Sequence, residues 1–124
     1  MTKSSGLGVI LKRFEQPDET RHFARGKFEV VQIGGMTIAR ASYEPGWKWS
    51  EHVAETMGAA SCPLEHVGLV VSGRAVVKMD DSAEREMCAG DLFYVAPGHD
   101  SWVVGDEPYV SLHFLGAETY AKNS

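Results

Sequence analysis

The sequence predicts a single all-β domain, and three observations support this fold class. Apolar and polar side chains alternate with a period of two in many short segments, which is the pattern of half-buried strands. The segments are separated by glycine, proline or aspartate clusters, such as Gly34-Gly35 and Pro97-Gly98. The 124 residues suffice for one hydrophobic core but not for two. About ten short strands at such regular spacing are typical of a sandwich or barrel.

The N-terminal part of the chain changes its pattern after residue 26. Residues 1–26 are mixed and predict an irregular arm, in which residues 17–25 could form a short helical turn. Residues 28–33 and 36–43 are two β-rich runs joined by a pair of glycines, and this arrangement predicts a hairpin.

The rest of the barrel, which we place at residues 27–116, continues the strand pattern. Residues 47–53 alternate and predict a strand, whereas residues 54–61 are weakly patterned and predict a loop. Pro63 lacks the N–H that a strand ladder needs, so the next strand should begin near it. The further predicted strands are residues 64–71, 74–79, 84–88, 92–95, 101–104 and 109–115. Residues 117–124 form a C-terminal tail.

Composition and charge exclude several classes of function. The formal net charge of -5 argues against nucleic acid as a partner, because phosphate binding needs a basic face. No uninterrupted apolar run approaches the roughly 20 residues that cross a bilayer, so we expect no membrane association. Arg13 and Glu15 follow the N-terminal apolar residues too soon for a signal peptide. Cys62 and Cys88 fit a reducing compartment, in which neither needs a partner, and we expect a cytoplasmic protein.

Residues 67–100 carry a resemblance to a known family. Gly90-Asp91 opens a strand that stops at Pro97-Gly98, with Ala96 at the place of a further proline. This pattern resembles the second motif of the cupin family, and the resemblance covers roughly residues 46–114. It implies a cupin double-stranded β-helix, or jelly-roll barrel, with its chemistry in the interior. It also implies a homodimer in which two barrels pair through an N-terminal strand, here residues 28–33.

The first motif of the family is altered in this chain. The family has His-x-His, then a glutamate, and a glycine six residues further on. His66 stands at the position of the metal-binding glutamate, and Cys62 has the spacing of the second histidine. Alternatively, His52 is the first histidine and an insertion follows it. In the second motif the family histidine falls on Ser101, but His99 lies two residues before it and shares its face of an extended strand.

The resemblance implies a divalent metal ion in the barrel, with His66, His99, Cys62 and His52 as candidate ligands. Thiolate and imidazole are good donors to borderline-soft cations, so we favour a zinc-type ion over iron, manganese or nickel. The alternative is a metal-free pocket lined by the same residues, because a lone buried histidine is more often a hydrogen-bonded core residue.

Aromatic residues near these positions suggest a ligand site. Trp47, Trp49 and Trp102 either pack in the core or in a dimer, or form the wall of a site for a small organic ligand. Asp100 either orients the imidazole of His99 or caps the preceding turn. For His113 we expect an outward position, because its neighbours in the strand form the better apolar stripe.

Two classes of function fit these expectations, besides a third interpretation of the chain as a structural dimer component. One is a metal-dependent enzyme, with a metal-free isomerase that uses a histidine as general base as its variant. The other is a non-catalytic module that binds or senses a small molecule, because a fold hosts many functions. The sequence names neither a reaction nor a substrate.

Overall fold

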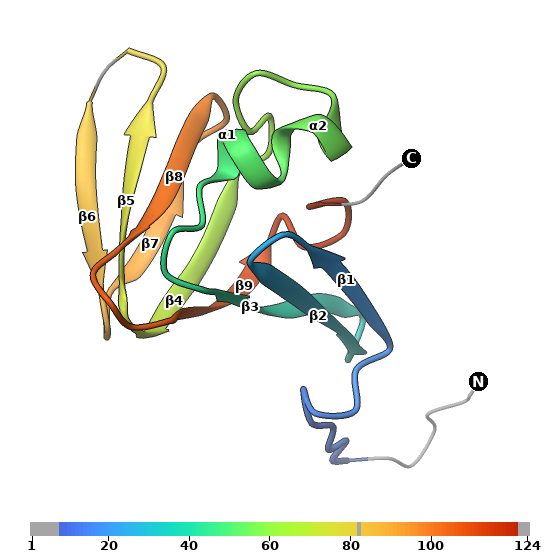
Figure 1. Ribbon diagram of the computed structural model, residues 1–124. Coiled ribbons are helices and arrows are strands. Elements are labelled where there is room, and N and C mark those ends of the chain that lie inside the picture. Colours follow the sequence, from blue (N-terminus) through green and yellow to red (C-terminus); the bar gives the residue numbers. More distant parts are fainter. Residues whose placement is uncertain (1–7, 82, 122–124) are drawn as a thin grey trace.

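The computed structural model describes residues 8–81 and 83–121 (Figure 1). In this part of the chain the strands are β1 (Glu19–Phe23), β2 (Gly26–Ile33), β3 (Met36–Tyr43), β4 (His66–Ser72), β5 (Arg74–Met79), β6 (Glu84–Cys88), β7 (Leu92–Val95), β8 (His99–Val104) and β9 (Tyr109–Leu115). The two helices are α1 (Trp49–His52) and α2 (Ala54–Met57). The prediction of an all-β fold is therefore confirmed.

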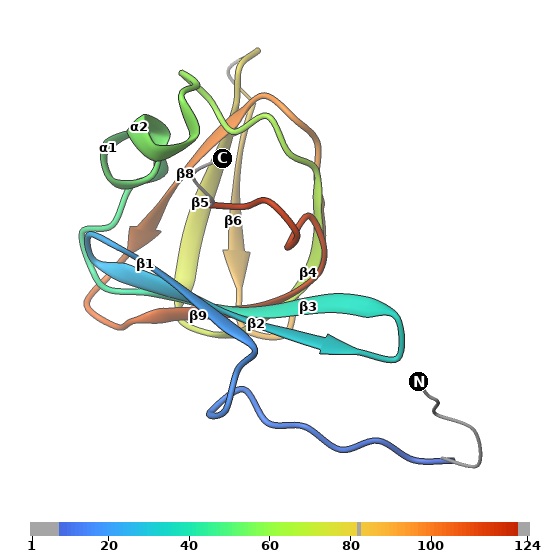
Figure 2. The ribbon, with the colours of Figure 1, turned by 90° about the vertical axis from the view of Figure 1, so that its right-hand side faces the viewer.

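The strands form two antiparallel sheets. A six-stranded sheet has the order β1-β2-β3-β9-β4-β7, and a three-stranded sheet has the order β6-β5-β8. Figure 2 shows the three-stranded sheet standing over the β9, β3 and β2 part of the larger sheet, with α1 and α2 at its side. The hydrophobic core lies between the sheets and contains fully buried residues such as Phe28, Trp47 and Trp49. The larger sheet brings β4 and β9 together, which is important for the site described below.

The hairpin of β2 and β3 confirms the prediction from the glycine pair. Gly34 and Gly35 both have positive φ angles, 57° and 80°, which most side chains disfavour. Two such residues form the tight turn whose twist matches that of the strands. Pairing then runs without a break from Ile33↔Met36 to Gly26↔Tyr43.

Two predictions in the first half of the chain are wrong. Residues 17–25 form no helical turn, because residues 19–23 are β1, which pairs along its whole length with β2. Backbone hydrogen bonds to an adjacent strand thus override a weak local helix signal. In consequence β2 lies between β1 and β3 and cannot be the exposed edge that we expected to pair two barrels. The homodimer itself stays a prediction.

The predicted strand over residues 47–53 is also wrong, because α1 occupies most of it. Trp49 and Val53 are both buried and are four residues apart, a spacing that suits one face of a helix. Residues 54–57 then form α2, where we expected a loop, and Gly58 ends it with a φ of 67°. In this segment Lys48 is extended and forms an isolated bridge with Trp102 of β8, and the carbonyl of Trp47 accepts a hydrogen bond from Val103 of β8.

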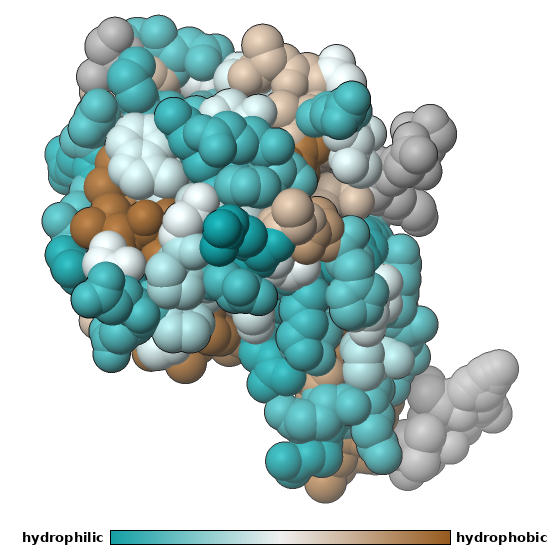
Figure 3. Space-filling model, in the orientation of Figure 1, coloured by the Kyte–Doolittle hydropathy of each residue, from teal (hydrophilic) through white to brown (hydrophobic). Residues whose placement is uncertain are grey.

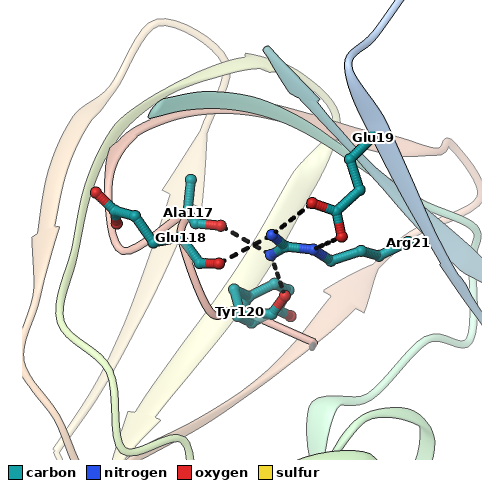
Figure 4. A network of polar contacts seen from close by, with 5 residues as sticks. All are labelled: Glu19, Arg21, Ala117, Glu118 and Tyr120. Atoms are coloured by element: carbon teal, nitrogen blue, oxygen red, sulfur yellow. Dashed lines mark hydrogen bonds and ion pairs between the residues drawn. The ribbon is translucent and has the colours of Figure 1, made fainter. Parts of the chain in front are cut away.

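The C-terminal turn, residues 117–121, packs against the core. Ala117, Tyr120 and Ala121 are buried. The guanidinium of Arg21 in β1 donates to the carbonyl oxygens of Ala117, Glu118 and Tyr120 and also pairs with the carboxylate of Glu19 (Figure 4). The buried guanidinium of Arg21 therefore links the C-terminal turn to β1.

The outside of the molecule differs from its interior. The face seen in Figure 3 is mostly hydrophilic, with smaller apolar areas between the polar ones. On the outer side of the larger sheet, the segment around Lys12 and Phe14 runs beside Val31, Ile38 and Leu112. Neither helix in the described ranges is long and apolar enough to cross a membrane.

Candidate metal centre

Three of the predicted metal ligands meet in the structure. Cys62 lies just before β4, His66 begins β4 and His99 begins β8, so residues from both sheets contribute. Cys62 and His99 form an isolated antiparallel bridge, in which the N–H of Cys62 donates to the carbonyl of His99 at 2.7 Å. Gly98, with a φ of 88°, donates in return to the carbonyl of Cys62. Backbone pairing thus places the thiol beside the turn that the second motif predicted.

The distances between the donor atoms suit a single cation. One ligand atom from each of Cys62, His66 and His99 lies within 4.8 Å of the other two, and Sγ of Cys62 is 3.5 Å from Nε2 of His66. Two ligands of a tetrahedral zinc ion, at the usual Zn–S and Zn–N distances, are roughly 3.3 to 3.7 Å apart. The residues present therefore fit such an ion with small shifts of the side chains. All three residues are buried.

The second nitrogen of His99 is held by the backbone. Nδ1 of His99 lies 2.7 Å from the carbonyl oxygen of Ala96, which can only accept a hydrogen bond. Nδ1 therefore carries the proton, and Nε2 keeps its lone pair. Metal-binding histidines usually have such a partner on the nitrogen that does not bind the metal. Asp100 does not take this role, because its carboxylate accepts hydrogen bonds from the N–H groups of Ser50 and Ser101.

Burial controls the protonation of the site. Desolvation lowers the pKa of His66 to about 2, with smaller effects from His113 and His99, and it also lowers the pKa of His99. Both imidazoles are therefore neutral at pH 7, as metal binding requires. Burial raises the pKa of the Cys62 thiol to about 11. A cation at the site would favour the thiolate and release its proton.

His113 faces the interior, and the prediction that it faces outward is wrong. Its ring is buried, and its centroid lies 5.3 Å from that of His66. Nε2 of His113 is 3.0 Å from Oγ of Ser111, and burial lowers the pKa of the ring to about 4. The apolar stripe was misleading because Leu112, on the opposite face, is also partly covered and lines a shared pocket with residues 12–14. The informative signal was the presence of two polar residues, Ser111 and His113, on the same face of a central strand.

A cavity of about 40 Å³ lies beside two of these ligands, His66 and His99. Its wall includes His66, His99 and His113, and its aromatic residues are Tyr43, Trp47, Trp49, Phe93, Tyr109 and Tyr120. Among the described residues that line it there is no Asp, Glu, Lys or Arg. The structure thus brings two of the predicted ligand-binding residues, Trp47 and Trp49, to the same cavity as the histidines.

Two other predicted site residues lie elsewhere. His52 is half-buried on α1, and its Nδ1 faces the backbone of Lys48 in the preceding turn, 3.1 Å from the carbonyl oxygen. It is not part of the cluster of ligand atoms found among the described residues. The ring of Trp102 stacks under the ammonium group of Lys48, 5.2 Å from the ring centroid, and is not part of the cavity wall.

Comparison with solved structures identifies the architecture. A sugar phosphate isomerase from Silicibacter pomeroyi, described as a cupin, aligns at 19% identity and a TM-score of 0.54, over 77% of this chain and 68% of that protein. A mutant of oxalate decarboxylase from Bacillus subtilis aligns at 24% identity and a TM-score of 0.57, over 86% of this chain and 29% of the decarboxylase.

The fold is that of the cupins. A protein of unknown function from Vibrio parahaemolyticus has a similar structure, at 19% identity and a TM-score of 0.58, over 78% of this chain and 97% of that one. Neither a family model nor a curated protein matches the sequence. The cupin resemblance predicted from residues 46–114 is thus confirmed at the level of the fold.

Proposed function

We propose that this cupin-fold protein binds a divalent cation of the zinc type through Cys62, His66 and His99, and a small organic ligand in the adjacent cavity. The observation that carries the proposal is the convergence of one thiol and two neutral imidazoles, all buried, within 4.8 Å. Sulfur and imidazole nitrogen together favour zinc over the harder cations that prefer oxygen ligands.

Three protein ligands leave one position of a tetrahedral ion free. Structural zinc sites use four protein ligands, whereas catalytic sites use three and leave one position for water or substrate. His113 is the other nearby imidazole, but it is not part of the cluster of ligand atoms, and its Nε2 contacts Ser111. When bound, such a cation supplies Lewis acidity to an oxygen of the ligand.

A second candidate function is binding without turnover. The described part of the cavity wall contains no carboxylate and no lysine, so its ionisable side chains are histidines and tyrosines. Burial keeps His66 and His113 neutral and raises the pKa of Tyr109 to about 12. Such groups are poorly suited to cycle protons at neutral pH, which favours a sensing or carrier role for the same site.

The test of the metal site is metal analysis of the purified protein, before and after incubation with zinc and dialysis. We expect one equivalent of zinc. We expect Cys62→Ser and His66→Ala to weaken zinc binding by more than about 100-fold, because changes to the outer partners of a ligand alone cost 10- to 100-fold. Cys88→Ser and His22→Ala are matched controls, because both residues lie away from the cluster of ligand atoms. They should retain the metal.

Cobalt provides a direct readout of the thiolate. The cobalt-substituted protein should show a thiolate-to-metal charge-transfer absorption that is absent from Cys62→Ser and present in Cys88→Ser. If the protein takes up no stoichiometric metal, or if Cys62→Ser keeps this absorption, the proposed centre is wrong.

A further inference from the structure

Two tryptophans that line the cavity have indole N–H groups without a partner, and Nδ1 of His66 and Nδ1 of His113 also lack one. Trp47 and Trp49 are each only 1% exposed, both line the cavity, and neither indole N–H has an acceptor in the described structure. A buried N–H without a partner costs free energy, and buried tryptophans normally find one. Because an indole N–H can only donate, the missing partner must be an acceptor.

The positions of the two tryptophans are well determined by their neighbours. The ring of Trp47 stacks on that of Tyr43, with centroids 3.8 Å apart and planes 2° from parallel, and its carbonyl accepts a hydrogen bond from Val103. Trp49 starts α1, and the N–H of Ser50 in this helix donates a hydrogen bond to the carboxylate of Asp100 in β8. Each indole is therefore held by packing that does not use its N–H group, and a ligand in the cavity is the available source of an acceptor.

The size of the cavity limits the ligand. A volume of about 40 Å³ corresponds to roughly three water molecules. The apolar part of the wall, with Val77, Met87 and Val95, suits a short hydrocarbon body. The ligand therefore has a few heavy atoms, with its acceptors at one end.

The charge of the site indicates which acceptor the ligand carries, and this step rests on the proposed function. A dication bound by one thiolate and two neutral imidazoles keeps a net charge of about +1. The described wall of the cavity offers no carboxylate to balance it, and the carboxylates of Asp80 and Asp100, which act on His99, are not part of that wall. A buried unbalanced charge is costly, so a ligand with one negative charge is favoured over a neutral one.

We propose that the cavity binds a short-chain monocarboxylate, whose oxygens accept hydrogen bonds from the indole N–H groups of Trp47 and Trp49. The carboxylate is the acceptor that satisfies two donors at once and balances the charge of the centre. Its short chain lies against the apolar wall.

The test uses the three indole N–H resonances of protein labelled with 15N-tryptophan, titrated with sodium propionate. Trp102 is an internal control, because it is not part of the cavity wall. We expect propionate to shift the resonances of Trp47 and Trp49 and to leave that of Trp102 in place, with assignments from Trp102→Phe. For the zinc-loaded protein we expect propionate to bind about 10-fold more tightly than neutral propionamide, the effect of one charge-assisted hydrogen bond.

The outcomes separate this inference from the metal site, because zinc content is measured on the same samples. A shift of the two cavity indoles by propionate, with or without zinc, supports an acceptor bound to both N–H groups, whereas the preference for propionate over propionamide tests the charge step and is measured on the zinc-loaded protein. Lack of zinc by itself contradicts the metal centre and the charge step, not the acceptor at the indoles. No shift at millimolar propionate, an equal shift of Trp102, or equal affinity for propionamide in the zinc-loaded protein would overturn the inference. Trp49→Phe, which removes the N–H and keeps an aromatic ring, should weaken propionate binding about 10-fold without loss of zinc.

Discussion

Sγ of Cys62 lies 3.5 Å from Nε2 of His66, although neither residue belongs to the usual histidine and glutamate pattern of the first cupin motif. Burial keeps the thiol protonated and the imidazole neutral, so the pair makes only a weak hydrogen bond. His99 approaches both from the other sheet. The three side chains thus stabilise one another only weakly, and backbone pairing holds their ligand atoms together. A cation would bind these atoms without a large rearrangement.

This arrangement predicts that zinc stabilises the folded protein. Zinc at about 100 times its Kd should add about 2.7 kcal/mol to the free energy of unfolding, because it binds the folded site and not the unfolded chain. For a domain of this size the melting temperature should rise by roughly 10 °C, which a thermal melt with and without zinc will measure.

His66→Ala should remove this effect of zinc, whereas Cys88→Ser should keep it. A melting temperature that does not respond to zinc in the wild-type protein would contradict the prediction. An equal response in His66→Ala would show that zinc binds elsewhere.

Arg21 should be essential for the C-terminal turn. Its side chain is only 7% exposed, and its guanidinium donates to three carbonyl oxygens of residues 117–120 (Figure 4). Arg21→Met would leave these carbonyls without their donor, and we expect a loss of about 3 kcal/mol in the free energy of unfolding. Hydrogen exchange should also become faster at Tyr120, whose ring contacts both Phe28 and His113.

Arg25→Met is the matched control for this prediction. Arg25 is exposed and makes one long hydrogen bond, 3.3 Å, to the carbonyl of Pro45. Its replacement should change stability by less than about 0.5 kcal/mol. Similar losses from both variants in urea unfolding would contradict the role that we assign to Arg21.

Gly68, the one glycine of β4, should not tolerate replacement by alanine. Its φ is not positive, so alanine could adopt its backbone conformation, but a Cβ would overlap the carbonyl oxygen of Leu112 and lie 2.7 Å from Cζ of Phe93. The pairing of β4 with β9 is irregular at this point. We expect Gly68→Ala to cost about 3 kcal/mol, measured by urea unfolding. Gly8→Ala, where nothing lies within 4 Å, should have little effect, and equal effects would disprove the steric argument.

The sequence allowed the ladder of strands and part of the site to be predicted, because both depend on local signals. Gly34-Gly35 and Pro97-Gly98 mark turns whose geometry few other residues adopt. The spacing of Cys62 and His66 relative to the family motif led to the cluster that the structure contains. The strand inferences needed only the period of the chain and its turn residues, whereas the ligand set came from the resemblance to the cupin motifs.

The remaining features depended on contacts between distant segments. His113 faces the site because β9 pairs with both β3 and β4, and no local pattern shows which face of a doubly covered strand lies inside. Residues 19–23 form a strand only because β2 is beside them. The local pattern places Trp49 and Val53 in an alternating strand. Their burial on one face of a helix depends on packing against the core, which the local pattern does not show.

Asp18 should make the attachment of the N-terminal segment sensitive to pH. Its carboxylate accepts hydrogen bonds from the N–H of Gln32 at 2.7 Å and from the ammonium of Lys12 at 2.8 Å. These bonds, first that of Gln32 and then that of Lys12, lower the pKa of Asp18 in the folded state. The contribution of these bonds to stability is therefore present above the ordinary aspartate pKa of about 3.9 and is lost as the pH falls through the lower folded value.

We expect Asp18→Ala to melt at a lower temperature than the wild type at about pH 7 and at nearly the same temperature at about pH 2. Asp106→Ala, a change in an exposed loop, is the control. Its difference in melting temperature from the wild type should be the same at about pH 7 and about pH 2. A difference between Asp18→Ala and the wild type that stays constant or grows on acidification would contradict the assigned role of the carboxylate.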